Sequence, residues 1–298
     1  HIYDTYTPLI KDVDLKFKYE ETKEIIKKAA QPLGENYIQT VEEGFNSGWI
    51  DVYENKGKRS GAYSSGCYGV HPYILMNYTQ DISNLFTLIH EMGHAMHSYY
   101  SNKNQPYLYA DYKIFVAEVA STLNENLLLD YMLKNAESRE EKLYLLNYFL
   151  EGFRGTVYRQ TMFAEFEKMI HQSVESGQSL TSQSMKKMYR NLNQKYFGES
   201  LVIDEKLDYE WARIPHFYYN FYVYKYATGY SAAAALADKI QSEGASAAAD
   251  YLEFLKAGGS DYPLNILKKA GVDMEKADAI ENAAAKFKKY LKQLQELI

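Results

Sequence analysis

Cysteine is nearly absent from this 298-residue chain, in which Cys67 is the only one. A single thiol excludes a disulfide within the chain and is typical of a reducing compartment. Long apolar runs are also missing, since no stretch approaches the roughly 18 consecutive apolar residues that suggest a membrane-spanning helix. No secretory leader is visible in a sequence that starts at His1. We therefore expect a cytoplasmic protein.

The chain also lacks an excess of positive charge, because its formal net charge is −6. An acidic surface attracts neither nucleic acid nor an anionic membrane, so we expect neither as a partner, and no stable protein partner is evident. What the chain does have is apolar content of 46%, enough for a substantial core, and 30 tyrosines. A surplus of tyrosine suits a wet internal cavity as well as ordinary packing.

Periodicity predicts a mainly α protein with one small sheet. Residues 1–12 resemble an irregular or extended lead, and a run rich in Gly and Ser, followed by β-type residues, predicts a hairpin or small sheet at 60–78. We read 1–80 as a helical lead with this sheet and 81–298 as a helical region. The predicted helices are 19–30, 36–45, 82–101, 111–135, 139–176, 181–197, 218–242, 244–257, 262–270 and 274–297.

The most specific pattern is His90-Glu-Met-Gly-His94, within an apolar-periodic stretch from Asn84 to Tyr100. On a helix, His90 and His94 lie one turn apart on the same face, so both imidazoles can reach one cation. Apolar residues at helical spacing supply a buried stripe that would hold the site rigid. This is the H-E-x-x-H arrangement of zinc sites, and we expect one Zn²⁺ per chain.

A catalytic zinc has three protein ligands, so one more must come from elsewhere. The best candidate is Glu118, which lies among apolar residues on what should be the next helix, folded back antiparallel. A carboxylate there is costly to bury unless a positive group meets it. Asp111 and Glu125 remain alternatives, and Glu125 could instead orient a ligating histidine.

Two further residues of the motif helix, His97 and Gly93, indicate the class of metal site and the packing of the helix. A metzincin would need Gly at 97 and His at 100, whereas this chain has His97 and Tyr100, so that class is excluded. His97 is expected to pack or hydrogen-bond beside the site, with a plain core histidine as the alternative. Gly93 costs a helix roughly 0.5–1 kcal/mol relative to Ala, which favours a close backbone approach there.

Three protein ligands leave one coordination position for water. Zinc lowers the pKa of that water and polarises a carbonyl, while Glu91 can take the proton as general base and pass it to the leaving amine. The tetrahedral intermediate then needs hydrogen-bond donors. A tyrosine-rich stretch offers them, because His216, Tyr219, Tyr222 and Tyr226 would share roughly one face of a helix.

Several segments, in this order along the chain, resemble the catalytic region of the oligoendopeptidase F family, bacterial relatives of thimet oligopeptidase. The resemblance covers essentially the whole chain. It is carried by Gly57-Lys-Arg-Ser-Gly-Ala-Tyr63, Pro72-Tyr-Ile-Leu-Met-Asn-Tyr78, His90-Glu-Met-Gly-His-Ala-Met-His97, Ala117-Glu-Val-Ala-Ser-Thr122 and Ile214-Pro-His-Phe-Tyr-Tyr-Asn-Phe-Tyr-Val-Tyr-Lys-Tyr226.

The resemblance implies a multi-helix zincin or oligopeptidase catalytic domain, with the segment 60–78 bordering the cleft. Family members carry a long N-terminal helical region that this chain does not match, so 1–298 is interpreted as a catalytic domain fragment. The implied roles are zinc ligation by His90, His94 and Glu118, general base catalysis by Glu91, and transition-state hydrogen bonding by His216, Tyr219 and Tyr226.

The leading hypothesis is therefore a zinc-dependent endopeptidase that hydrolyses short peptides through a zinc-activated water. Two alternatives stay open. One is a thermolysin-like protease that acts on proteins and shares the same ligands. The other is a truncated fragment that binds zinc and peptide without turnover.

Overall fold

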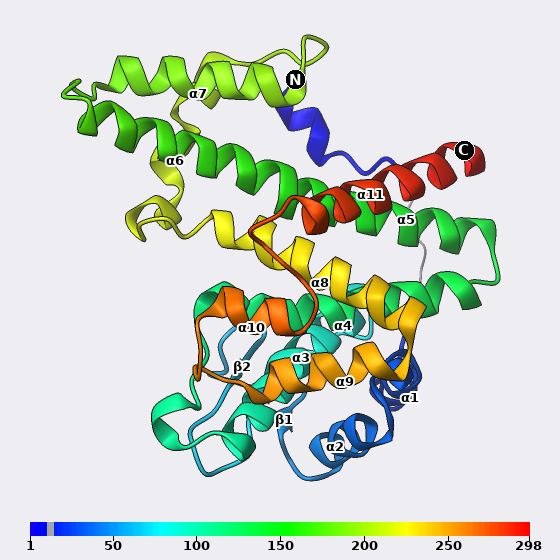
Figure 1. Ribbon diagram of the computed structural model, residues 1–298. Helices are drawn as coiled ribbons and strands as arrows, with labels where there is room; N and C mark the ends of the chain where they lie inside the picture. The colour runs from blue at the N-terminus through cyan, green and yellow to red at the C-terminus, as the bar shows by residue number, and fades with distance from the viewer. Residues whose placement is uncertain (11–14) are drawn as a thin grey trace. The chain divides into compact units, whose positions relative to one another are not determined.

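A computed structural model describes residues 1–10 and 15–298 (Figure 1). The described chain is mainly α-helical with one three-stranded sheet, which confirms the fold class that the sequence predicts. It divides into two compact units. Unit 1 comprises His1–Asp12 and Asn147–Thr228, and unit 2 comprises Val13–Leu146 and Gly229–Ile298.

Unit 2 contains most of the helices and the sheet. Its elements are α1 (Tyr19–Ala29), α2 (Glu35–Asn46), β1 (Ile50–Asp51), β2 (Tyr63–Ser65), β3 (Tyr73–Leu75), α3 (Ile82–Asn104), α4 (Ile114–Asn135), α9 (Ala245–Lys256), α10 (Pro263–Lys269) and α11 (Asp278–Leu297). Two helices are shared between the units along the chain, namely α5 (Arg139–Phe153) and α8 (Tyr224–Glu243).

Helix α3 starts at a side-chain cap. The carboxylate of Asp81 accepts a hydrogen bond from the backbone N–H of Asn84 at 2.8 Å, which satisfies one of the free donors of the first turn. Burial raises the pKa of Asp81, but hydrogen bonds from Thr79 and Asn84 outweigh it and lower the pKa. The helix is thus fixed at its N-terminus, two turns before His90.

Helices α3 and α4 form the centre of unit 2. Both carry buried residues along most of their length. Helix α4 is apolar over most of its surface, which suits a helix that packs against both α1 and α3. Helix α9 covers α3, so the motif helix is enclosed (Figure 1).

Gly93 lies where the two central helices come closest. A Cβ atom added at Gly93 would lie 2.6 Å from the Cα atom of Ser121 and 2.7 Å from the carbonyl oxygen of Ala120. Both distances are far below van der Waals contact, so only glycine allows the backbones to approach this closely. The close backbone approach that the sequence predicts is confirmed.

The sheet has the strand order β1-β3-β2. Strands β2 and β3 are antiparallel, with Ser64 opposite Ile74, and they lie within the predicted segment 60–78. Strand β1, parallel to β3, was not predicted, because a two-residue strand contains no alternation to detect. Both β2 and β3 contact α3, and Ile74 is buried.

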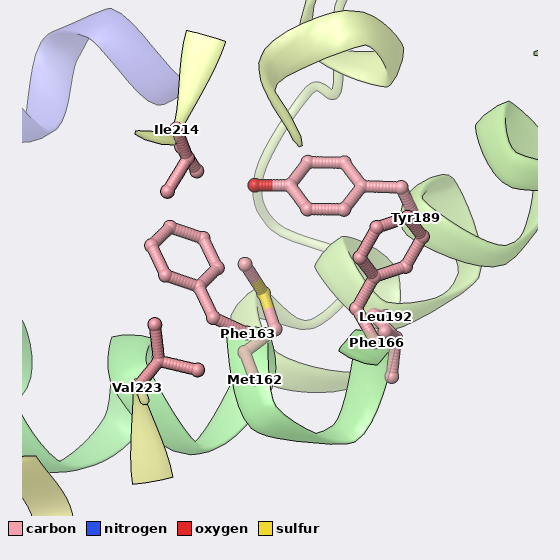
Figure 2. Packing of buried hydrophobic residues seen from close by; sticks show 7 residues of the cluster. All are labelled: Met162, Phe163, Phe166, Tyr189, Leu192, Ile214 and Val223. Atoms are coloured by element: carbon pink, nitrogen blue, oxygen red, sulfur yellow. The ribbon is translucent and has the colours of Figure 1, made fainter. Parts of the chain in front are cut away.

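Unit 1 is organised around α6 (Arg159–Glu175) and α7 (Ser182–Phe197), which pack against each other as a helical hairpin. Aromatic and aliphatic side chains from α6 and α7 meet two residues from the later, mostly non-helical part of the unit (Figure 2). The cluster consists of Met162, Phe163, Phe166, Tyr189, Leu192, Ile214 and Val223. It holds the segment that follows α7 against α6.

The predictions for unit 1 are partly wrong. The lead contains a 3₁₀-helix, Ile2–Tyr6, and residues 11 and 12 of the predicted lead lie outside the described residues. The predicted helix 139–176 is confirmed as α5 and α6, which are joined by a π-helical turn at Arg154–Tyr158. The predicted helix 218–242 begins only at Tyr224, because Phe221 has a left-handed φ of 53°, which no α-helix accommodates.

Among the described residues, no helix combines the length and the apolar character that crossing a membrane requires.

We expect Gly93→Ala to destabilise the fold by about 1–3 kcal/mol, because the added methyl group overpacks the contact between α3 and α4. Gly152→Ala is the matched control. Gly152 also lies in a helix, but its Cβ position has no atom within 4 Å, so alanine should stabilise by about 0.5–1 kcal/mol. Denaturant unfolding measures both changes. Equal stability of Gly93→Ala and the parent protein would contradict the close packing.

Candidate metal centre

Three of the predicted ligands converge in unit 2. His90 and His94 lie one turn apart on α3, and their Nε2 atoms are 3.1 Å apart. The Oε2 atom of Glu118, on α4, is 3.4 Å from each of these nitrogens. All three side chains are half-buried. The close packing of α3 and α4 at Gly93 therefore brings two nitrogens and one carboxylate oxygen to a common point.

Glu125 orients the first of these histidines. Its Oε1 atom accepts a hydrogen bond from Nδ1 of His90 at 2.7 Å, so Nε2 of the same ring faces His94 and Glu118. Burial lowers the pKa of His90, but hydrogen bonds with Glu118 and Glu125 outweigh it and raise the pKa to about 10. Of the roles considered for Glu125, its geometry fits the orienting one. Asp111, the other alternative ligand, is exposed and outside this group.

Glu118 has a supporting partner that the sequence analysis missed. The hydroxyl of Ser121 donates to Oε2 of Glu118 at 3.0 Å, from one turn later on α4. Burial raises the pKa of Glu118, but hydrogen bonds from His90 and His94 outweigh it and lower the pKa well below its usual range. The spacing of three residues on a predicted helix is the signal that could have identified Ser121.

Glu91 lies beside the ligands but is not part of the group. Its side chain is buried, and burial raises its pKa, while the positive charge of the nearby histidines and a backbone hydrogen bond from Ser64 act in the opposite direction. Ser64 belongs to β2, so the strand lies next to this carboxylate. A carboxylate with a raised pKa in a largely buried position is suited to accept and release a proton.

The donor set fits zinc. Within residues 1–10 and 15–298, His90, His94 and Glu118 are the one group of three or more His, Cys, Asp or Glu side chains that could hold a metal ion. Two imidazole nitrogens and one carboxylate oxygen are ligands that zinc accepts, and three protein ligands leave a position open. The hydrogen bonds to His90 and Glu118 provide the outer support that such ligands usually have.

His97 is a core histidine, which is the alternative considered for it from the sequence. Its ring is fully buried and stacks on Tyr112, with centroids 3.7 Å apart and planes 3° apart, and it also contacts Phe254. Burial lowers the pKa of His97 to about 3, so the ring is neutral. The structure therefore places His97 in the core between α3, α9 and the connection that precedes α4.

The tyrosine-rich segment belongs to unit 1. The hydroxyl of Tyr226 lies 3.3 Å from Nε2 of His216, and the ring of Tyr222 contacts both residues. Tyr219 contacts Tyr222 and is 64% exposed. The prediction of one shared helical face is wrong, because α8 starts at Tyr224. The cluster forms instead by a bend of the chain that brings these rings back to His216.

Comparison with known proteins identifies the family of the chain. Residues 2–286 match the model of peptidase family M3. The chain belongs to peptidase family M3.

Two curated relatives are similar over the whole chain. The chain is 57% identical to "Oligopeptidase PepF" of Bacillus subtilis, with 100% of this chain and 44% of the relative covered. It is 49% identical to "Oligoendopeptidase F, chromosomal" of Lactococcus lactis subsp. cremoris, with 100% and 49% covered. The chain spans about half the length of these curated relatives.

A solved structure of an M3 relative has the same fold. The crystal structure of oligoendopeptidase-F from Enterococcus faecium superimposes with a TM-score of 0.77 at 40% sequence identity. The match covers 100% of this chain and 46% of the other. The resemblance to the oligoendopeptidase F family that the sequence indicates is confirmed.

We expect Glu125→Ala to weaken zinc binding by roughly 10- to 100-fold, because the Nδ1–H group of His90 loses its acceptor and the ring loses its orientation. Glu125→Gln keeps an acceptor oxygen, so its loss should be smaller. Competition with a chromophoric chelator measures the affinity. Glu42→Gln, which removes a surface carboxylate of α2, serves as the control. Unchanged affinity in Glu125→Ala would show that Glu125 does not orient the ligand.

Proposed function

We propose that this chain forms the catalytic region of a zinc-dependent endopeptidase that hydrolyses short peptides. Membership of peptidase family M3 supports peptide hydrolysis, and relatives named oligopeptidase and oligoendopeptidase support short substrates. The observation that carries the proposal is the convergence of His90, His94 and Glu118 beside the buried Glu91. In this proposal the three converging residues bind one zinc ion, and residues 1–298 act as one catalytic domain.

When bound, zinc would lower the pKa of a water molecule and polarise the scissile carbonyl. The chain's own contribution is to move the proton. Glu91 takes the proton from the attacking water and passes it to the leaving amine. Its burial favours this role, because a carboxylate with a raised pKa takes a proton from the water more readily than an exposed one does. Ser64 keeps the carboxylate oriented through its backbone hydrogen bond.

His216, Tyr219 and Tyr226 are proposed to donate hydrogen bonds to the oxygen that becomes negatively charged in the transition state. Donors arranged in advance at such an oxygen lower the barrier, because they need no reorganisation during the reaction. The contact between Tyr226 and His216 supports a prearranged pair. The exposure of Tyr219 leaves its hydroxyl available to a substrate.

The edge of the small sheet is the proposed docking site for the peptide backbone. Among the described strands, β2 pairs with β3 on one side only, so no strand covers its other edge. A peptide can add to such an edge as a further strand. Since Ser64 in β2 is hydrogen-bonded to Glu91, a peptide on this edge would lie close to the general base.

We expect Glu91→Gln to lower kcat/KM by roughly 10²–10⁴-fold and to leave zinc content unchanged, because the amide cannot accept the proton and is not a ligand. The measurement combines hydrolysis of a quenched-fluorescent peptide with metal analysis of both proteins. Casein, assayed beside the peptide, tests substrate size.

Two outcomes would contradict this proposal. If the parent protein binds zinc but hydrolyses the peptide no faster than Glu91→Gln, the chain binds zinc and peptide without turnover. If casein is cleaved as efficiently as the short peptide, the restriction to short substrates is wrong.

A further inference from the structure

A buried carboxylate on α6 binds the backbone of the tyrosine-rich segment. Glu167 is only 2% exposed, and its Oε1 atom accepts a hydrogen bond from the backbone N–H of Phe221 at 2.8 Å. Burying a carboxylate is costly unless it is hydrogen-bonded. The hydrogen bond from Phe221 offsets part of this cost. In return, Glu167 stabilises the backbone conformation at Phe221.

Phe221 has a conformation that phenylalanine rarely adopts. Its φ of 53° lies in the left-handed region, where a residue with a Cβ atom pays roughly 1–2 kcal/mol. Its own burial cannot offset this cost, because the side chain is 46% exposed. The ring does contact His171, which lies one turn after Glu167 on α6. Two neighbouring residues of α6 therefore hold Phe221 in place, one by its amide and one by its ring.

Apolar packing holds the two ends of the tyrosine-rich segment, residues 214–223. Ile214 and Val223 are both buried in the apolar cluster on α6 and α7, and Figure 2 shows them on either side of Phe163. Between these two anchors Phe217 also packs on Phe163 and Phe166, whereas Tyr218 is 84% and Tyr219 is 64% exposed. The backbone N–H of Tyr219 donates to the carbonyl of His216 within the segment, and the hydrogen bond from Phe221 to Glu167 ties the segment to α6.

The bend at Phe221 decides where the tyrosines lie. The bend there places the rings of Tyr222 and Tyr226 5.5 Å and 6.0 Å from that of His216. In a continuous helix, these two residues would lie roughly 9 Å and 15 Å along the axis from His216, too far for either ring to contact it. The left-handed residue thus converts a linear stretch into a cluster.

We propose that Glu167 is a positioning residue, which holds Phe221 in its left-handed conformation and thereby arranges Tyr222 and Tyr226 around His216. This inference rests on the proposed function, in which that cluster donates hydrogen bonds to the transition state. Glu167 itself touches neither substrate nor metal in this role.

Two pairs of variants test the bond from its two ends. Glu167→Met keeps the volume but removes the acceptor, whereas Glu167→Gln keeps an acceptor oxygen. Phe221→Pro removes the N–H and forbids a positive φ, whereas Phe221→Gly keeps the N–H and adopts positive φ freely. We expect kcat of the zinc enzyme to fall roughly 10- to 100-fold in Glu167→Met and Phe221→Pro, with KM within about two-fold. Glu167→Gln and Phe221→Gly should retain most activity.

Hydrogen exchange provides a readout independent of activity. Amides in the segment 214–223 should exchange faster in Glu167→Met than in Glu167→Gln, while zinc content stays constant. The control is Glu165→Met, which removes another carboxylate of α6, one that pairs with Lys195 of α7. This variant should change neither the exchange rates of these amides nor kcat. Should Glu167→Met fold poorly, Phe221→Pro, altered at an exposed side chain, tests the same bond.

The result that would overturn the inference is unchanged kcat in Glu167→Met and Phe221→Pro. Tyr226→Phe separates this failure from failure of the proposed function. If Tyr226→Phe lowers kcat while both of these variants do not, only the role of Glu167 is wrong. If Tyr226→Phe also leaves kcat unchanged, the cluster does not serve the transition state, and the role assigned to it in catalysis is wrong.

Discussion

The backbones of α3 and α4 approach each other at Gly93 more closely than any residue with a Cβ atom would allow. This contact sets the distance between the helix that carries His90 and His94 and the helix that carries Glu118. Side chains of these lengths meet at one point only when the helix axes are close. A glycine that weakens its own helix by roughly 0.5–1 kcal/mol therefore allows the three side chains of the candidate metal centre to meet.

The polar contacts of the centre follow from the same packing. Once α4 lies against α3, Glu125 comes within hydrogen-bonding distance of His90, and Ser121 supports Glu118 one turn after it. The carboxylates raise the pKa of His90, and the histidines lower that of Glu118. A bound cation would take the place of the protons that hold this group together, so metal binding and proton release are coupled.

The sequence predicted those parts of the centre that local spacing determines. His90, His94 and Glu91 follow from helical periodicity, and Glu118 from a carboxylate in an apolar helix. The bend at Phe221 was not predictable, because phenylalanine carries no signal for a left-handed conformation and the residues around it have helical spacing. Its causes, Glu167 and His171, lie about fifty residues earlier, where only the tertiary fold reveals them. Strand β1 was not predictable for a related reason. Its two residues form a strand only through their pairing with β3, which is distant in the sequence.

The most direct test of the account is an anomalous-scattering map at the zinc edge from crystals of the zinc-loaded protein. We expect one peak per chain, with two imidazole nitrogens at roughly 2.0–2.1 Å from His90 and His94 and a carboxylate oxygen at roughly 2.0–2.2 Å from Glu118. A peak at another site, or a first shell that contains His97 or Asp111 in place of one of these residues, would contradict it.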